Sequence, residues 1–64
     1  MDKIRIAFFD DHPLMLHGLA HTLAAESDFI VVGYGGTAVE AIRCAQAEAP
    51  DVMLLDVQMP GGGL

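Results

Sequence analysis

Residues 7–15 read AFFDDHPLM, where an apolar run meets two adjacent carboxylates, Asp10 and Asp11, followed by a histidine and a proline. The run belongs to a longer segment, residues 4–9, in which nearly every position is apolar. Strands that are covered on both faces have this pattern. Proline is favourable in the first turn of a helix. The stretch therefore predicts a buried strand that ends at two acidic residues and leads directly into a helix.

The rest of the chain continues this alternation of apolar runs and helical patterns. Two further buried strands are predicted at residues 29–34 and 52–56, both rich in β-branched or other large apolar residues. Apolar residues spaced three and four apart predict an amphipathic helix over residues 13–25. The same spacing predicts a second helix that starts with a Thr37–Glu40 capping box and ends before Pro50. The two apolar stripes are formed by Leu16, Leu19, Ala20, Leu23 and Ala24, and by Ala38, Ala41, Ile42 and Ala45.

Composition restricts the class of protein. The 64 residues are fewer than the ~100–150 usual for one domain, so we expect a small domain or a piece of one. Nine acidic and three basic residues give a net charge of −6, which disfavours nucleic acid binding by this segment. No apolar run approaches the ~20 residues of a membrane span, and the first residues do not resemble a signal peptide. With a lone cysteine, Cys44, these features predict a cytoplasmic protein without a membrane contact.

Three strands alternating with two helices predict a parallel α/β sheet with right-handed crossovers. Handedness leaves two arrangements open: both helices on one face, or one helix on each face with strand order 2-1-3. In the second arrangement the first and third strands are neighbours. Their carboxyl ends would then bring Asp10, Asp11 and Asp56 to one crevice.

Three carboxylates at one crevice would repel one another unless a cation lies among them. Magnesium is bound by carboxylates, main-chain carbonyls and water, and commonly serves phosphate chemistry. An aspartate in such a site can also be the nucleophile that accepts a phosphoryl group.

Three stretches, IRIAFFDDHPLMLHGL, VVGYGGTAVEAI and PDVMLLDVQMPGG, resemble the first half of a response-regulator receiver domain of bacterial two-component signalling. The resemblance covers essentially the whole chain and rests on the acidic pair, on Asp56, and on Met59-Pro60-Gly61. The segment DDHPLM is most similar to the corresponding segment of receivers with a LuxR-type helix-turn-helix output domain. The resemblance implies a flavodoxin-like (CheY-like) sheet of order 2-1-3, with residues 1–64 as the amino-terminal part of a receiver.

The resemblance also implies roles for individual residues. Asp56 would be the phosphoacceptor, phosphorylated by a sensor histidine kinase. Asp10 and Asp11 would hold Mg²⁺, with Asp11 the direct ligand and the main-chain carbonyl of Gln58 a further one. DNA would be bound only through an output domain. Receivers also use a Ser or Thr from the fourth strand and a Lys from the fifth, which we expect to lie outside this sequence.

Two other functions share parts of these patterns. GYGGTA places Gly33, Gly35 and Ala38 in a G-x-G-x-x-A arrangement after a strand, as in a dinucleotide-binding βαβ unit. That interpretation leaves Asp10 and Asp11 unexplained. A magnesium-dependent hydrolase with an aspartyl nucleophile would use the same acidic site. Such a hydrolase would release phosphate repeatedly, whereas a receiver takes one phosphoryl group and holds it. We therefore expect a receiver not to be an enzyme with a separate substrate.

Several other residues are expected to have no chemical role. His17 and His21 have the spacing of two zinc ligands but lack a third, so they are expected on an exposed or partner-facing helix side. His12 is assigned no chemistry, and Cys44, Met15 and Met53 are expected to pack.

The third strand of a half-sheet would keep an apolar edge that recruits another chain, and the leucines of the first helix would not be fully buried. We therefore expect residues 1–64 alone to self-associate.

Overall fold

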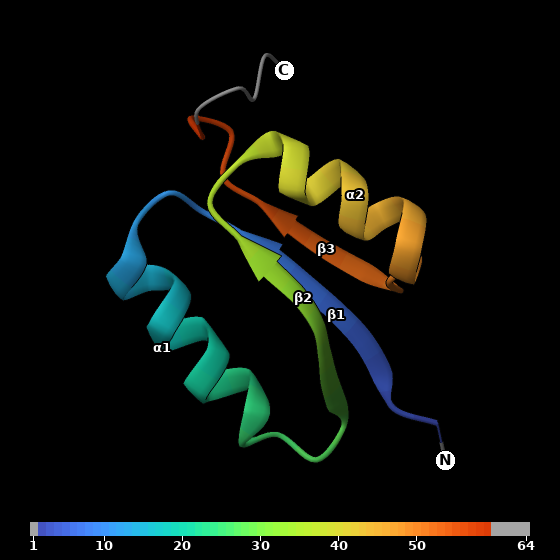
Figure 1. Cartoon of the computed structure of the whole chain (residues 1–64). Coiled ribbons are helices and arrows are strands. Elements are labelled where there is room, and N and C mark those ends of the chain that lie inside the picture. Colours follow the sequence, from blue (N-terminus) through green and yellow to red (C-terminus); the bar gives the residue numbers. More distant parts are fainter. Residues whose placement is uncertain (1, 60–64) are drawn as a thin grey trace.

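The computed structural model describes residues 2–59, which form a three-stranded parallel sheet with two helices packed on it (Figure 1). The strands are β1 (Ile4–Phe9), β2 (Phe29–Gly35) and β3 (Val52–Leu55), and the helices are α1 (Pro13–Ala24) and α2 (Ala38–Glu48). The strand order is β2-β1-β3, which confirms the predicted order. The predicted ends of the strands and of the first helix lie within one residue of the observed ones.

The central strand β1 forms the core of the sheet. Its last four residues, 6–9, are buried, and Phe8 is fully buried. Ala7 and Phe9 face α2 and share a hydrophobic cluster with Ala41 and Met59. Phe8 has the opposite orientation and stacks on Tyr34 of β2 with a distance of 5.5 Å between ring centroids. Both faces of β1 are therefore covered, as its continuous apolar sequence predicts.

The other two strands are less buried than their sequences predict. Val52, Leu54 and Leu55 of β3 are 41–45% exposed. The backbones of both helices lie against β1 and β2, so β3 has only β1 as its backbone neighbour among residues 2–59. The prediction that all three strands are covered on both faces is therefore wrong for β3, which neither helix covers within residues 2–59. A continuous apolar run identifies a strand, but not its position in the sheet.

Helix α1 begins with Pro13 in its first turn, as predicted. None of its residues is buried, and the three leucines predicted to lack full burial are partly exposed. Met15, predicted to pack, is 52% exposed, so that prediction is wrong. His17 and His21 are both exposed, as expected. In the described part of the chain, neither helix is long and apolar enough to cross a membrane.

Helix α2 begins at the predicted capping box. The Thr37 hydroxyl accepts a hydrogen bond from the Glu40 N–H at 3.2 Å and donates to the Glu40 carboxylate at 3.0 Å. Ala49 follows the helix with a left-handed φ of 45°, and Pro50 prevents its continuation.

The inward face of α2 differs from the predicted stripe. Ala41 is buried and Cys44 packs against the core cluster, as does Met53 of β3, so these two residues pack as predicted. Ile42 is 57% exposed and Ala45 is also exposed, although both were predicted to face inward. The α2 side chains that reach the core cluster form a single row along the helix.

Two glycines of β2 allow α2 to approach the sheet closely. A Cβ atom at Gly33 would collide with the Cys44 sulfur, and one at Gly35 would collide with the Glu40 carboxylate. Both glycines are therefore needed for packing. A larger residue at either position would separate the helix from the strand.

Gly33→Ala is expected to destabilise the protein by about 1–3 kcal/mol because the added methyl group overpacks the contact with Cys44. The double variant Gly33→Ala/Cys44→Ala should regain much of the lost stability, because the colliding sulfur is absent. Gly18→Ala is the control: a Cβ there meets nothing within 4 Å, so the change should stabilise α1 by about 0.5–1 kcal/mol. Urea unfolding of the parent and these three variants measures the effects, and equal stability of Gly33→Ala and the double variant would contradict the packing account.

Candidate functional site

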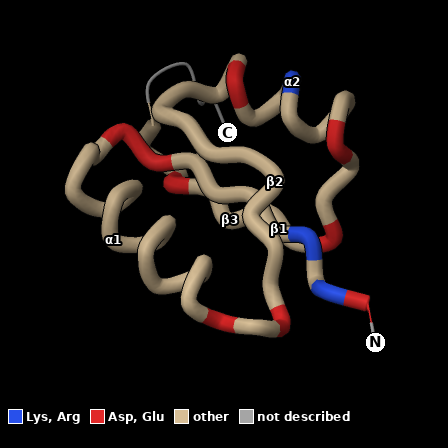
Figure 2. Tube along the Cα trace, turned by 60° about the horizontal axis from the view of Figure 1, so that its bottom comes forward, with Lys and Arg blue, Asp and Glu red and all other residues tan. Residues whose placement is uncertain are grey.

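Two neighbouring strands carry the acidic residues of the site. The Asp10 N–H donates to the Gly35 carbonyl at 3.0 Å, and the Asp56 N–H donates to the Phe9 carbonyl at 3.0 Å. Each aspartate therefore continues the hydrogen-bonded ladder at the carboxyl end of its strand. Figure 2 shows acidic residues at this end of β1, whereas its other end, towards the amino terminus, carries both basic and acidic residues. The sheet order thus brings together residues that are far apart in the sequence.

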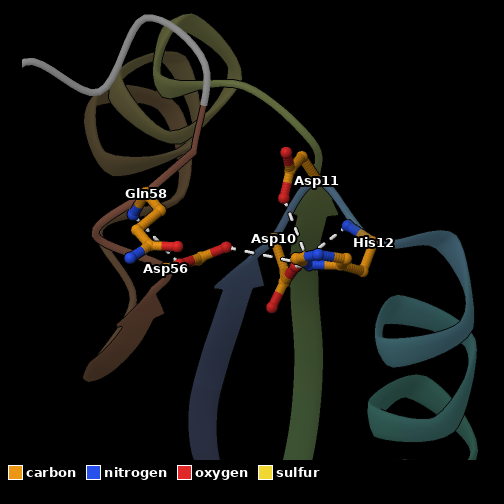
Figure 3. Close-up of polar contacts among 5 residues, drawn as sticks. All are labelled: Asp10, Asp11, His12, Asp56 and Gln58. Carbon is orange, nitrogen blue, oxygen red and sulfur yellow. Dashed lines mark hydrogen bonds and ion pairs between the residues drawn. The ribbon is translucent and has the colours of Figure 1, made fainter.

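Four side chains meet at this end of the sheet: Asp10, Asp11, His12 and Asp56. One ligand-type atom from each lies within 4.8 Å of the others. The His12 ring points between the three carboxylates (Figure 3). Its Nδ1 atom lies 2.6 Å from Asp10 Oδ1, 3.2 Å from Asp11 Oδ1 and 3.9 Å from Asp56 Oδ2. The three aspartates expected at one crevice do lie together there.

The residues after Asp56 form a tight turn that fixes its carboxylate. Asp56 Oδ1 accepts the Gln58 N–H at 3.0 Å, and the Asp56 carbonyl accepts the Met59 N–H at 3.2 Å. Met59 is buried in the core cluster, so it anchors the turn. Pro60 and Gly61, the rest of that predicted motif, lie outside the described residues. The ligand role of the Gln58 carbonyl stays a prediction.

Asp10 and His12 form an ion pair that changes the pKa of both groups. Hydrogen bonds from the His12 ring and from the His12 N–H, the latter 2.9 Å from Asp10 Oδ1, hold the pKa of Asp10 below its ordinary value of 3.8. The side-chain hydrogen bond to Asp10 is also the main reason that the pKa of His12 is raised above its ordinary value of 6.5, and the negative charge of Asp11 is the second reason. A protonated His12 offsets part of the repulsion among the carboxylates.

His12 is the site residue that sequence analysis missed, since it was assigned no chemistry. Its position directly after the acidic pair was the available signal. His12 is also the N-cap residue of α1, with extended backbone angles and no side-chain cap, because its ring bonds to Asp10 instead.

The donor set fits a hard divalent cation. Three carboxylates offer oxygen ligands from two strand ends, and oxygen is the ligand atom that Mg²⁺ prefers. Asp10 and Asp56 are mostly covered by protein, with 17% and 19% of their side chains exposed. Partial burial lowers the local dielectric and strengthens their attraction for a cation. A groove of about 190 Å³ adjoins the carboxylates between α1 and β3, with Met15, Leu19, Leu54 and Leu55 in its walls.

The dinucleotide interpretation is not favoured by the structure. The glycines of GYGGTA serve the packing of α2, as described above. The Glu40 carboxylate lies 3.4 Å from the Gly36 N–H at the N-terminus of α2, where a pyrophosphate would bind. The Glu40 carboxylate and a pyrophosphate would therefore compete for the same backbone N–H groups.

Comparison with known proteins identifies the family. The model of the response regulator receiver domain family matches residues 6–63. The transcriptional regulatory protein YxjL of Bacillus subtilis is 44% identical over 59 residues, which make up 92% of this chain and 27% of YxjL. The chain belongs to the response regulator receiver domain family, a class of signalling domain.

Solved structures agree with this assignment. The receiver domain of NarL from Mycobacterium tuberculosis superposes with a TM-score of 0.89 at 38% identity, covering 95% of this chain and 49% of that one. RcsB from Salmonella enterica serovar Typhimurium, solved bound to the promoter rprA with a phosphomimetic, gives a TM-score of 0.84 at 25% identity. That match covers 92% of this chain and 29% of RcsB. The fold is therefore that of a CheY-like receiver, and the chain spans only part of each relative.

We predict that the NMR-detected pKa of His12 lies above 6.5, and that Asp10→Asn lowers it by removing the main hydrogen-bond acceptor. Asp28→Asn, at the other end of the sheet, should leave the pKa of His12 unchanged. The raised pKa of His12 stabilises the fold fully below pH 6.5, and this contribution is lost as pH rises through the raised value.

The lowered pKa of Asp10 stabilises the fold above pH 3.8, and this contribution is lost as pH falls through the lowered value. The pair therefore stabilises most between pH 3.8 and 6.5. A His12 pKa that is insensitive to Asp10→Asn would show that the ion pair does not form in solution.

Proposed function

We propose that this chain forms the phosphoacceptor part of its receiver, with Asp56 accepting a phosphoryl group from a sensor histidine kinase. In this proposal Asp10, Asp11, Asp56 and the main-chain carbonyl of Gln58 hold Mg²⁺, with Asp11 the direct ligand of the acidic pair. The observation that carries the proposal is the meeting of carboxylates from two neighbouring strand ends within 4.8 Å of one another.

The arrangement suits phosphoryl transfer. A carboxylate oxygen of Asp56 attacks the phosphorus, a P–O bond forms, and the bond to the leaving group of the donor breaks, which gives an acyl phosphate. When bound, Mg²⁺ neutralises charge on the phosphoryl oxygens during transfer. The Gln58 N–H bond orients Asp56, because it occupies one oxygen at 3.0 Å. We expect one phosphoryl group to be taken and held, without turnover of a separate substrate.

The roles of the whole protein extend this proposal. The chain spans about a quarter of the length of YxjL, a transcriptional regulatory protein, and 29% of the RcsB chain solved with promoter DNA. By analogy, phosphorylation would control an output domain that binds DNA, since the net charge of −6 makes this segment itself a poor DNA ligand. A regulator of this kind acts in the cytoplasm, where kinase and DNA are both accessible.

In the complete protein, Asp56→Asn is expected to abolish phosphorylation while the fold is retained, because an amide of the same shape cannot act as the nucleophile. Intact mass after incubation with Mg²⁺ and a small phosphodonor such as acetyl phosphate measures the adduct. Asp28→Asn, the same change at the far end of the sheet, should be phosphorylated like the parent. An adduct of undiminished yield on the Asp56→Asn variant would disprove the assignment of the phosphoacceptor.

We further propose that residues 1–64 on their own self-associate through the edge of β3. Among residues 2–59, β3 pairs with β1 alone, and its large side chains Val52, Leu54 and Leu55 are 41–45% exposed. A short apolar strand of this kind can pair with another chain.

Sedimentation equilibrium should therefore give a dimer or larger species for residues 1–64 at micromolar concentration. Leu54→Lys should shift this equilibrium to the monomer, because a charge on the edge opposes pairing. Leu14→Lys, at a position on α1 that is 88% exposed, is the matched control and should leave association unchanged. A parent chain that sediments as a monomer would refute the proposal.

A further inference from the structure

The position of Asp56 depends on the strand with the fewest neighbours. β3 pairs with β1 through four residue pairs, from Ile6 opposite Val52 to Phe9 opposite Leu55. Neither helix backbone lies against β3 within residues 2–59. The register between β3 and β1 therefore determines where Asp56 lies relative to Asp10.

Asp51 closes the β1–β3 ladder at its amino end. Its side-chain Oδ2 accepts the Arg5 N–H at 2.9 Å, and its own N–H donates to the Arg5 carbonyl at 2.8 Å. One residue thus bonds to both backbone groups of Arg5. A shift of β3 by one residue would break both bonds at once.

The Arg5 side chain holds the segment that leads into β3. Its guanidinium donates to the Glu48 and Ala49 carbonyls at the end of α2 and forms an ion pair with the Glu48 carboxylate at 3.1 Å. Ala49 has a left-handed backbone, so the chain turns sharply here before it reaches Asp51. Arg5 therefore holds both ends of the segment between α2 and β3: its side chain bonds to the end of α2, and its main chain bonds to Asp51.

We propose that Asp51 is a positioning residue for Asp56: it locks the register of β3 on β1 and so holds Asp56 within the carboxylate cluster. A slip by one residue would move Asp56 by about 3.3 Å along the strand and turn the side chains of β3 to the opposite face. Such a displacement is comparable to the whole 4.8 Å extent of the cluster.

The functional consequence rests on the proposed magnesium site, so one readout uses Mg²⁺ and a second does not. In the first, calorimetry measures Mg²⁺ affinity of the protein. Asp51→Ala should weaken it by about tenfold, as loss of groups that support metal ligands commonly does. Asp51→Asn keeps an oxygen acceptor for the Arg5 N–H and should bind like the parent. Leu23→Ala, on the half-buried side of α1, should lower stability without weakening Mg²⁺ binding.

In the second readout, amide hydrogen exchange follows the Asp56 N–H, which bonds to the Phe9 carbonyl. Asp51→Ala should speed exchange there far more than at the Asp10 N–H, which bonds to the Gly35 carbonyl of β2 on the opposite side of β1. Leu23→Ala should change both sites in proportion, because it acts through global stability.

The outcomes separate the two proposals. Parent-like Mg²⁺ affinity in Asp51→Ala, together with weakened affinity in Asp56→Asn, would overturn the positioning role and leave the metal site standing. Parent-like affinity in Asp56→Asn would instead remove Asp56 from the ligand set, and the exchange experiment would then decide the role of Asp51. Equal loss of protection at the Asp56 and Asp10 N–H groups in Asp51→Ala would overturn the register lock.

Discussion

The parallel pairing of β1 with a strand on each side is the constraint on which the rest of the structure depends. β1 contributes the only consecutive buried residues of the described chain, residues 6–9, and both helices pack against it and β2. Because all three strands run in the same direction, their carboxyl ends lie at one edge of the sheet. The order β2-β1-β3 then makes Asp10 and Asp56 neighbours. The site is thus a consequence of strand order rather than of any local motif.

The same arrangement concentrates negative charge, and it raises the pKa of the neighbouring His12 ring, which favours the protonated form. His12 lies within 4 Å of all three carboxylates and bonds most closely to Asp10. Protonation of His12 neutralises part of the negative charge of the site, and a bound divalent cation would neutralise more of it. A divalent cation would be attracted by the same oxygens, so we expect the arrangement of the His12 ring to depend on whether such a cation is bound.

The sequence predicted the elements well because each carries a local signal. The Thr37–Glu40 capping box and Pro13 mark helix starts, and the three apolar runs mark strands, with errors of one residue at most. The sheet order came from resemblance, since handedness left two arrangements open. Side-chain burial was predicted less well: Ile42 is exposed because only one row of α2 side chains reaches the sheet. The acidic members of the site were predicted, because Asp10, Asp11 and Asp56 follow strands and topology alone brings them together. The roles of His12 and Asp51 were not, because they depend on side-chain hydrogen bonds set by loop geometry, which residue spacing does not encode.

The central claim is that the ends of β1 and β3 form one cation site, and paramagnetic broadening by Mn²⁺ tests it most directly. Mn²⁺ is an oxygen-preferring substitute for Mg²⁺ and broadens the NMR signals of nearby amides. At substoichiometric Mn²⁺, the account predicts that signals of residues 10–12 and 56–58 broaden first and that excess Mg²⁺ restores them. Broadening that begins instead at Glu48 and Asp51, the acidic pair at the opposite end of the sheet, would contradict the account.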